Sequence, residues 1–401
     1  MTVVSTYFGM NPFRRITWMT LGACLLLLAG CRTLQVDYLE LSDKEGWRTE
    51  GASAERQHVT ADPIDAPLEE AWIYNAGAGF GPLSPLVLRN VMLVATRKGE
   101  VHGINLETGK KAGVENFGDA IDGTPLVVGD LMYVPVADGR RALTAYNLRR
   151  GKKAWEVKGT PVETGLLAVG DGVVAVDADA TVRRYRSDSK EPVWETALGD
   201  DITIHATPLL SDGRIIIIDD QGGVVALDPV DGAVQWTTAL GKPVYTSVAA
   251  NETHIFIPTT RARFVALDAL GNTAWDFSLP DTTIRFAPPA VDKDLVIFGA
   301  SDGVVRALDA NTGAERWTFK DDAAITAAPL ITPNTIYIGT MGKMLFGLNP
   351  ADGVVQWQHE LKGRVKSAMA ASGGHLVVLS EPRYVYLFKP TPTGGPVASG
   401  Q

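Results

Sequence analysis

Cysteine is nearly absent from this chain of 401 residues, and its two cysteines, Cys24 and Cys31, both lie within the N-terminal apolar stretch. A disulfide elsewhere in the fold is therefore excluded, so the fold must be stabilised by packing. Zinc and iron–sulfur centres built on thiolate clusters are excluded for the same reason. We expect no metal and no cofactor in this protein.

Paired histidines and an excess of positive charge are also missing. The six histidines are scattered along the sequence instead of standing at metal-ligand spacing. The formal net charge is −9, which disfavours binding to nucleic acid or to anionic lipid, because both attract positively charged surfaces. No set of residues indicates a catalytic centre. We therefore expect a protein that is not an enzyme and that binds neither nucleic acid nor a small-molecule substrate.

Long uninterrupted helices are excluded by the abundance of turn residues. The chain contains 41 Gly and 23 Pro, which interrupt it too often for a helical protein. Its 45% of hydrophobic and 21% of charged residues are ordinary for a folded soluble protein. This composition favours an all-β chain with many turns.

The N-terminus has the pattern of a secretory signal peptide, which we place at residues 1–30. Arg14 and Arg15 precede an apolar run over residues 16–28, and small residues follow it up to Cys31. The run is too short to span a bilayer well. Its ending, Leu-Ala-Gly-Cys, resembles the bacterial lipobox, and this resemblance implies cleavage before Cys31 and acylation of that cysteine. The alternatives are an ordinary cleaved signal and an uncleaved anchor helix, for which Cys31 would be incidental.

The segment that follows is predicted to be a flexible tether. Residues 31–68 are rich in Asp, Glu, Ser and Ala without sustained periodicity, so we expect them to carry the folded body away from the lipid. Arg32 is not the aspartate that retains many lipoproteins in the inner membrane. The lipobox resemblance therefore implies a location at the outer membrane, facing the periplasm. At the other end, we expect a disordered tail over residues 391–401.

Tryptophan recurs through the body of the chain and indicates an internal repeat. Seven tryptophans are spaced by about 40 residues, with one double gap in which Gly113 stands at the expected position. Each repeat shares a pattern such as Ala307-Leu308-Asp309, followed by Gly313 and Trp317. We interpret the tryptophans as structural groups wedged between adjacent sheets. They are Trp72, Trp155, Trp194, Trp236, Trp275, Trp317 and Trp357.

Each repeat is predicted to form four short strands joined by tight turns. β-Branched runs such as residues 215–218 alternate with pairs such as Asp302-Gly303, which supply the positive φ of hairpin turns. Four antiparallel strands per repeat form the blade of a β-propeller. The last unit has no tryptophan and Trp72 has no strands before it, so the two termini complete one blade. We predict a single all-β domain over residues 69–390, an eight-bladed propeller of four-stranded antiparallel blades closed by a blade shared between the termini.

The repeat residues resemble the PQQ-like, or quinoprotein-type, propeller motif. In that motif Ala-x-Asp-x-x-Thr-Gly-x-x-x-Trp recurs once per blade, and it is matched by Ala307, Asp309, Thr312, Gly313 and Trp317. The resemblance keeps a PQQ-dependent dehydrogenase as an alternative. Those enzymes are longer, carry a vicinal disulfide beside the quinone and hold a calcium or lanthanide ion, whereas this chain has no cysteine after residue 31. These departures favour a propeller without quinone chemistry.

One face of the predicted propeller gathers arginine and aromatic residues. On that face the turns between second and third strands stand beside the connections between blades. Arginine and aromatic side chains dominate the hot spots of protein interfaces, so this face is the candidate site for a protein partner. A solvated rim with scattered cations is the alternative. The candidate partner-binding residues are His205, Tyr245, Arg261, Arg263, Arg285, Phe286 and Arg364.

The lipobox, the acidic tether and the eight-bladed ring together resemble the BamB family of lipoproteins, which serve the machinery that inserts β-barrels into the outer membrane. The resemblance implies a scaffold that docks on the β-barrel insertase complex and reaches the membrane through its lipid anchor. The binding loops differ, because residues 201–205 and 242–245 are shorter and lack the family's Leu-x-Leu-Arg run and paired aspartates. Another envelope scaffold with the same propeller is therefore an alternative.

Overall fold

The computed structural model describes residues 33–42, 46–118, 120–137 and 141–391. The predicted signal peptide, the predicted lipidation site Cys31 and the tail from residue 392 lie outside the described residues. The described residues belong to one compact unit. None of its helices is long and apolar enough to cross a bilayer.

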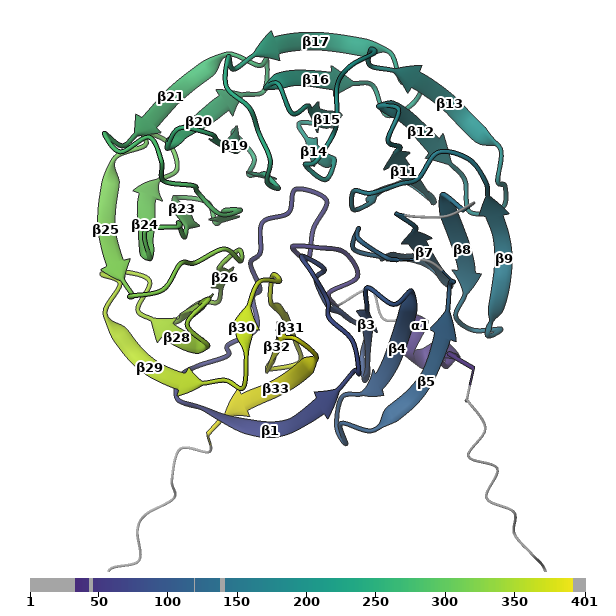
Figure 1. Ribbon diagram of the computed structural model, residues 1–401, viewed down its shortest axis with the longest axis horizontal. Helices are drawn as coiled ribbons and strands as arrows, with labels where there is room; N and C mark the ends of the chain where they lie inside the picture. The colour runs from purple at the N-terminus through teal and green to yellow at the C-terminus, as the bar shows by residue number, and fades with distance from the viewer. Residues whose placement is uncertain (1–32, 43–45, 119, 138–140, 392–401) are drawn as a thin grey trace, which may run out of the picture. The chain divides into compact units, whose positions relative to one another are not determined.

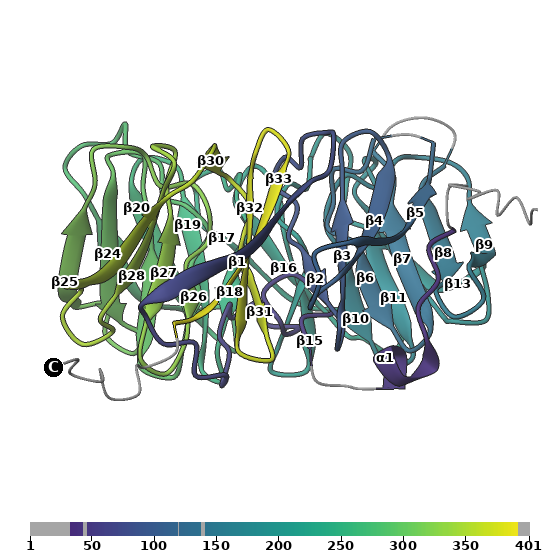
Figure 2. The same ribbon diagram turned by 90° about the horizontal axis from the view of Figure 1, so that it is seen from below.

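Eight small antiparallel sheets stand around a central axis as the blades of a propeller (Figure 1). In seven of them, four strands follow one another in sequence order across the sheet. Figure 2, a side view, shows the strands running between the two faces of the ring. The all-β, eight-bladed fold predicted from the repeats is confirmed.

The strands of blades 1 to 7 each run in chain order from the axis outwards. Blades 1 and 2 consist of β2 (Leu86–Val87), β3 (Val91–Ala95), β4 (Glu100–Asn105), β5 (Lys111–Asn116), β6 (Leu126–Val128), β7 (Leu131–Pro135), β8 (Leu143–Asn147) and β9 (Lys152–Val157). Blades 3 and 4 consist of β10 (Leu167–Val169), β11 (Gly172–Val176), β12 (Thr181–Tyr185), β13 (Pro192–Ala197), β14 (Leu209–Ser211), β15 (Arg214–Ile218), β16 (Gly223–Leu227) and β17 (Val234–Ala239).

The remaining strands complete the ring. Blades 5 and 6 consist of β18 (Ala249–Ala250), β19 (His254–Thr259), β20 (Arg263–Asp268), β21 (Thr273–Ser278), β22 (Ala290–Val291), β23 (Leu295–Phe298), β24 (Val304–Asp309) and β25 (Glu315–Lys320). Blades 7 and 8 consist of β26 (Leu330–Ile331), β27 (Ile336–Gly339), β28 (Met344–Leu348), β29 (Val355–Glu360), β30 (Arg364–Val365), β31 (Ala370–Ser372), β32 (His375–Glu381), β33 (Tyr384–Pro390) and β1 (Leu68–Asn75).

The ring is closed by blade 8, which is built from both ends of the chain. β1 pairs with β33 in antiparallel register, with Ile73 opposite Tyr386, and β33 pairs in turn with β32. In Figure 1 the dark blue β1 lies along the outer side of the yellow β33. β1 thereby covers a sheet edge that would otherwise be open to pairing with another chain. The predicted blade shared between the termini is confirmed.

A bulge at one repeated position brings each outer strand into the same orientation. In blades 1 to 7 the register shifts between the third and fourth strands, one residue after the position paired with tryptophan or, in blade 1, with Gly113. In blade 6, for example, Ala307 lies opposite Trp317 and the shift follows before Leu308. An extra residue increases the local twist of a strand. Because the bulge keeps the same offset, the tryptophans occupy equivalent places around the ring.

Most tryptophans join their own blade to the next one. Trp317 Nε1 donates a hydrogen bond to Pro350 O of the following blade at 2.9 Å, and four other tryptophans make the equivalent bond. The glycine in the adjacent turn is needed for this packing. Gly353 has a φ of +73°, and a Cβ there would lie 2.5 Å from Cε3 of Trp317. The indole ring and the glycine turn thus form one seam between blades.

Blade 1 lacks its tryptophan, and the N-terminal segment of the chain fills the space. Gly113 lies opposite Gly103, at the position that tryptophan occupies in the other blades. A Cβ on Gly113 would lie 2.7 Å from Thr33 O, and a Cβ on Gly103 would lie 2.6 Å from Cδ1 of Leu34. Leu34 is 0% exposed. A buried leucine from residues 33–36 therefore takes the place of the missing indole.

The same segment also replaces the hydrogen bond of the missing tryptophan. Val36 N–H donates to Leu148 O of blade 2 at 2.9 Å. Leu148 corresponds to Leu106 of blade 1, whose carbonyl oxygen accepts the bond from Trp72 Nε1 at 2.8 Å. Tyr146 adds a hydroxyl hydrogen bond to Leu34 O at 2.9 Å. The seam between blades 1 and 2 is thus closed by a strand-like segment instead of a ring.

Residues 46–62, the channel segment, fill the centre of the ring, where Figure 1 shows their purple trace. Backbone N–H groups of the innermost strands donate to its carbonyl oxygens, blade after blade, at 2.8–3.0 Å. With the donor given first, these bonds join Val127 to Arg48, Leu210 to Ala54, Ala250 to Glu55, Val291 to Gln57 and Ile331 to His58. Val87 N–H of blade 1 donates likewise to Trp47 O at 2.8 Å, so the channel segment pairs with six different blades.

This arrangement differs from the flexible tether predicted for residues 31–68. Trp47, Arg56 and Ile64 are each at most 1% exposed, and Leu34 is fully buried. The lack of periodicity that suggested a tether has another physical cause. A segment that pairs with one residue from each of many blades needs no helical or strand period, because its environment changes at every step. The described part of the segment is packed, and α1 (Tyr38–Ser42) lies within it.

Candidate partner-binding face

One face of the ring, the connection face, is formed by the connections between blades and by the turns between second and third strands. A pocket of about 290 Å³ lies at its centre. The floor includes Glu50 of the channel segment, and the wall includes His205 and Tyr245. Residues directly before the first strands complete the wall, and they are short: Thr124, Gly165, Thr207, Ser247, Pro288, Ala328 and Ala368.

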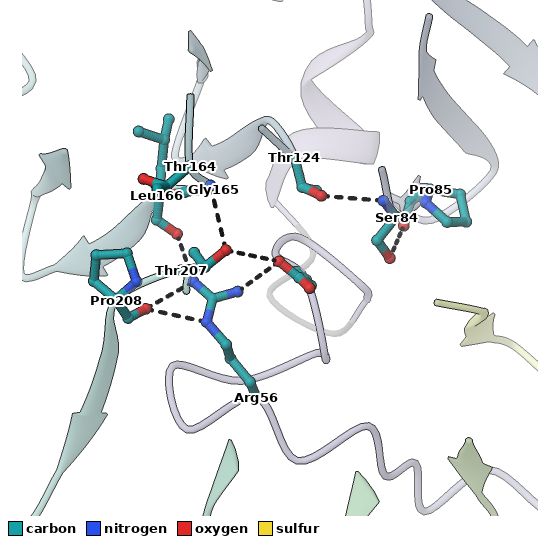
Figure 3. A network of polar contacts seen from close by, with 10 residues as sticks. Arg56, Ser84, Pro85, Thr124, Thr164, Gly165, Leu166, Thr207 and Pro208 are labelled. Carbon is teal, nitrogen blue, oxygen red and sulfur yellow. Dashed lines mark hydrogen bonds and ion pairs between the residues drawn. The ribbon is translucent and has the colours of Figure 1, made fainter. Parts of the chain in front are cut away.

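Arg56 holds Glu50, which lines this pocket, and Figure 3 shows the polar contacts of the Arg56 side chain. Its side chain is 1% exposed. Nε and Nη2 donate to Pro208 O at 3.0 and 2.8 Å, and Nη2 also donates to Leu166 O at 3.1 Å. Nη1 lies 3.0 Å from Glu50 Oε2, which also accepts a hydrogen bond from Thr207 Oγ1 at 3.4 Å. Burial lowers the pKa of Arg56, and Glu50 opposes that shift. The guanidinium stays charged and is compensated by these acceptors.

His58 is the other buried titratable group of the channel segment. Burial and, to a smaller extent, the neighbouring positive charge of Arg56 together lower the pKa of His58 to about 3. His58 is therefore neutral at neutral pH. Its 2% exposure places it in the packed centre of the ring, out of reach of a ligand in solvent.

A basic groove of about 550 Å³ lies on the connection face where blades 7, 8 and 1 meet. One carboxylate, Glu381, lines it, and its Oε1 accepts hydrogen bonds from the N–H groups of Phe80 and Gly81 at 3.2 and 2.9 Å. Of the cations, Arg97 is paired with Asp122 at 2.9 Å. Five exposed cations line the groove: Arg97, Lys343, Lys362, Arg364 and Lys366. The groove is thus locally positive in a chain whose net charge is −9.

Three of the candidate partner-binding residues line these two hollows. His205 and Tyr245 lie side by side, with ring centroids 5.6 Å apart, and Tyr245 is 60% exposed. Both line the central pocket, whereas Arg364 lines the basic groove. The candidates are therefore distributed over the face and do not form a single cluster.

The three arginines of blades 5 and 6 have different surroundings. Arg261 is exposed in the β19–β20 turn, with a φ of +62°. Arg263 Nε lies 3.1 Å from Asp276 Oδ2 of its own blade, and its Nη1 donates to Leu240 O in the connection from blade 4 at 3.2 Å, so this side chain is already engaged. Arg285 is exposed in the connection between blades 5 and 6. Arg261 and Arg285 are thus the more accessible of the three.

Phe286 is not available to a partner, contrary to its place among the candidates. It is 6% exposed, and its ring lies 4.8 Å from the ring of Phe298 and 6.3 Å from that of Phe264. It belongs to the core between blades 5 and 6. Residues of a connection alternate between solvent and core, and here Arg285 points outwards and Phe286 inwards. Position on the connection face alone therefore does not imply exposure.

The sequence pattern missed most of the basic groove. Lys343 comes from the β27–β28 turn, whereas Lys362 and Lys366 come from the connection between blades 7 and 8. No local run of positive charge joins them with Arg97, which lies in blade 1. The groove is visible only once blade 8 brings the first and last repeats together. The predicted blade shared between the termini makes the first and last repeats neighbours, and this prediction could have been used to place these residues near one another.

Two further features bear on chemistry. Residues 299–303 match the Gly-x-Ser-x-Gly pattern of a nucleophile elbow, but they join β23 to β24 in an antiparallel hairpin, and an elbow needs a following helix. Ser301 Oγ accepts the N–H of Arg285 at 2.9 Å, so the hydroxyl stabilises the turn. In the part of the chain that the structure describes, no group of three or more His, Cys, Asp or Glu residues is placed to hold a metal ion.

The four-stranded blades, the tryptophan seams and the closing blade define the class of the protein as a PQQ-like repeat β-propeller. The family described as outer membrane protein assembly factor BamB matches the sequence over residues 36–164, 143–245 and 220–388. The chain belongs to the BamB family.

Individual relatives are distant. An outer membrane protein assembly factor BamB from Nitrosomonas eutropha is 24% identical over 200 residues, which cover 49% of this chain and 48% of that protein. The match thus spans about half the length of that relative. The crystal structure of BamB from Moraxella catarrhalis has 21% identity and a TM-score of 0.67, covering 80% of this chain and 100% of that one.

A redox enzyme has the same architecture. A quinohemoprotein alcohol dehydrogenase from Pseudomonas putida has 12% identity and a TM-score of 0.74, covering 93% of this chain and 85% of that one. At these identities, the two structural similarities establish the propeller fold and carry no information about activity.

Proposed function

We propose that this protein is a non-enzymatic, lipid-anchored scaffold that holds protein partners during the assembly and insertion of β-barrel proteins in the outer membrane. The observation that carries the proposal is the BamB family match, which extends from residue 36 to residue 388. The connection face supports it with two hollows of different chemistry, a hydroxyl-lined pocket and a basic groove. Arginine and aromatic side chains at their margins are typical of protein interfaces.

The anchor is the second part of the proposal. Cleavage after residue 30 and acylation of Cys31 would tie the ring to a membrane, and Arg32 favours the outer membrane and a periplasmic location. Two acyl chains or one chain with a second signal are needed for stable anchoring.

The filled channel supports a function without catalysis. A quinone cofactor needs an enclosed space at the centre of its propeller, whereas here residues 46–62 occupy the centre and Arg56 locks them to blades 3 and 4. The pocket at the centre of the connection face is lined by hydroxyls, by Glu50, which Arg56 engages, and by Asp122, Glu163, His205 and Lys366, of which Asp122 is paired with Arg97. We therefore assign the connection face to recognition and not to a reaction.

A different envelope scaffold is the second candidate. Residues 201–205 and 242–245 lack the Leu-x-Leu-Arg run and the paired aspartates of the family's binding loops. If these loops determine the partner, the same anchored propeller would hold another envelope complex. The basic groove contains no residue of either loop, although its Lys366 also lines the central pocket, and it is the feature through which we test the assembly function.

The test is complementation of a strain that lacks the gene for this protein. One variant, the groove variant, combines three changes that reverse charge in the basic groove. They are Lys362→Glu, Arg364→Glu and Lys366→Glu, all at exposed positions. We expect this variant to leave the level of folded β-barrels in the outer membrane as low as in the deletion strain, because an acidic partner surface would be repelled. Folded barrels are measured by their slower migration in unheated gel samples.

A matched control separates the groove from the total charge. Lys190→Glu, Lys293→Glu and Lys320→Glu change the same number of exposed lysine or arginine charges away from the groove, and this variant should restore barrel levels fully. Full restoration by the groove variant would refute the assignment of the partner to the groove. No loss of folded barrels in the deletion strain itself would refute the assembly function.

A further inference from the structure

Two turns at the outer edge of blades 1 and 2 concentrate positive charge. One lies between β4 and β5, and the other lies between β8 and β9. The corresponding turn of blade 3, at residues 186–191, holds Arg186 and Lys190 together with Asp188 and Glu191, whereas those of blades 4 to 7, at residues 228–233, 268–272, 309–314 and 349–354, contain no Lys or Arg. The charge is therefore not a property of the repeat. We name these exposed residues the basic edge: Lys110, Lys111, Arg149, Arg150, Lys152 and Lys153.

Neighbouring carboxylates compensate the basic edge only in part. Lys153 forms an ion pair with Glu156, and Arg149 lies 3.9 Å from Asp130. The exposed Glu107 and Asp37 add two further negative charges, and Asp37 directly follows Val36, whose N–H donates to Leu148 O. Among the described residues, no ion pair involves the other four cations of the edge. The edge thus keeps a positive surface, although the whole chain has a net charge of −9.

The basic edge lies directly beside the segment that leads back to Cys31. Thr33 forms a bridge with Val114 of β5, and Gln35 Nε2 donates a hydrogen bond to Arg149 O at 2.8 Å. A Cβ on Gly151, in the second basic turn, would lie 3.3 Å from Cγ2 of Thr33. The backbone at Thr33 is therefore fixed between the two basic turns.

The covalent chain leaves little distance between this point and the predicted anchor. Cys31 precedes Thr33 by two residues, and two fully extended residues span at most about 7 Å. An acyl group on Cys31 would thus hold the outer edge of blades 1 and 2 at the lipid surface. A flexible tether over residues 31–68 would have allowed the ring to take any orientation relative to the membrane. A linker of only two residues between Cys31 and Thr33 allows few orientations.

We propose that the basic edge binds the anionic phospholipid headgroups of the membrane that holds the anchor. This inference rests on the acylation of Cys31 put forward under the proposed function. Clustered Lys and Arg beside a lipid anchor act as a second binding signal for anionic membranes. The local cluster overcomes the unfavourable net charge because charges farther than a Debye length of about 8 Å from the surface are largely screened. The edge then sets the orientation of the ring at the membrane.

Vesicle binding of the full chain carrying Cys31→Ala tests the edge without the acyl groups. The probes are phosphatidylcholine vesicles with and without about 30% phosphatidylglycerol, because only the latter carry the negative charge that attracts Lys and Arg. We expect sedimentation with the anionic vesicles alone, and loss of this binding at high salt. Lys110→Glu, Lys111→Glu and Lys152→Glu together should weaken it roughly tenfold or more. The variant with Lys190, Lys293 and Lys320 changed to Glu should bind like its parent.

The outcomes separate this inference from the anchor. Equal vesicle binding by the edge variant and its parent would overturn the inference, and so would binding to neutral vesicles alone. The edge variant could instead lose a protein that cross-links to its parent in membranes while it still binds anionic vesicles. That result would assign the basic edge to an acidic protein partner and would also overturn the inference. The anchor is judged separately, by mass spectrometry of Cys31 and by pelleting of the unchanged protein with membranes. A positive anchor result with a negative vesicle result refutes the edge alone.

Discussion

Arg56 brings a positive charge into the centre of a β-propeller, where a hydrophobic side chain would be the simpler choice. Its donors reach carbonyl oxygens of blades 3 and 4 and the carboxylate of Glu50, so one residue ties the channel segment to two blades. The sequence gives no sign of this role. Arg56 stands in an acidic, aperiodic stretch, and its acceptors at Leu166 and Pro208 are 110 and 152 residues away.

Replacing Arg56 tests whether the channel segment stabilises the ring. Arg56→Met should lower the free energy of unfolding by about 3–5 kcal/mol, because the Glu50 carboxylate is left without its partner in a largely buried place. The measurement is urea unfolding followed by tryptophan fluorescence. The double variant with Glu50→Gln should lose less than the sum of the two single changes, because it leaves no unpaired charge. A loss below about 1 kcal/mol for Arg56→Met would show that the segment is only loosely held.

At the scale of elements, the tryptophan spacing was enough to predict the blades and how they close. The pairing of β1 with β33 could be predicted because the last repeat lacks its tryptophan strand, whereas the strand of Trp72 has no other strands of a blade before it. The gap at Gly113 was also visible, but the element that fills it was not. Leu34 belongs to no repeat, and a single leucine in a polar stretch has no period by which it could be assigned to a seam.

The N-terminal segment should stabilise the ring as much as a core strand does. Leu34→Ala removes a fully buried side chain from the seam between blades 1 and 2 and should cost about 2–5 kcal/mol. The comparison is Val354→Ala, a residue that is 60% exposed in blade 7, whose effect should stay within about 0.5 kcal/mol. Both are measured by the same urea unfolding. Equal, small effects would mean that residues 33–36 merely lie on the surface.

At the scale of the whole molecule, the proposed orientation and the candidate face fit together. The basic edge and Thr33 lie at the outside of blades 1 and 2, whereas the central pocket and basic groove open on the connection face. A ring held by its edge would leave the connection face open to a partner in the periplasm.

The sequence repeat places the candidate residues on one face only approximately, and their role in partner binding stays a prediction. His205 and Tyr245 do meet, because equivalent positions of adjacent blades stand side by side around a ring. Phe286 lies in the core, because the repeat cannot tell which residue of a connection turns inwards. Lys343, Lys362 and Lys366 come together with Arg97 only through the closed ring. The local sequence shows the alternating cations Lys362, Arg364 and Lys366, but it gives no sign that Lys343 and Arg97 lie beside them.

The central claim is that this propeller holds the β-barrel insertase at the outer membrane, and the most direct measurement is affinity capture of the tagged, lipidated chain from mildly cross-linked membranes. We expect the insertase and its lipoproteins to be captured with it. The Lys362, Arg364 and Lys366 charge-reversal variant should lose them, whereas the Lys190, Lys293 and Lys320 variant should retain them. Capture of a different envelope complex, with the insertase absent, would contradict the claim and leave only the propeller and its family standing.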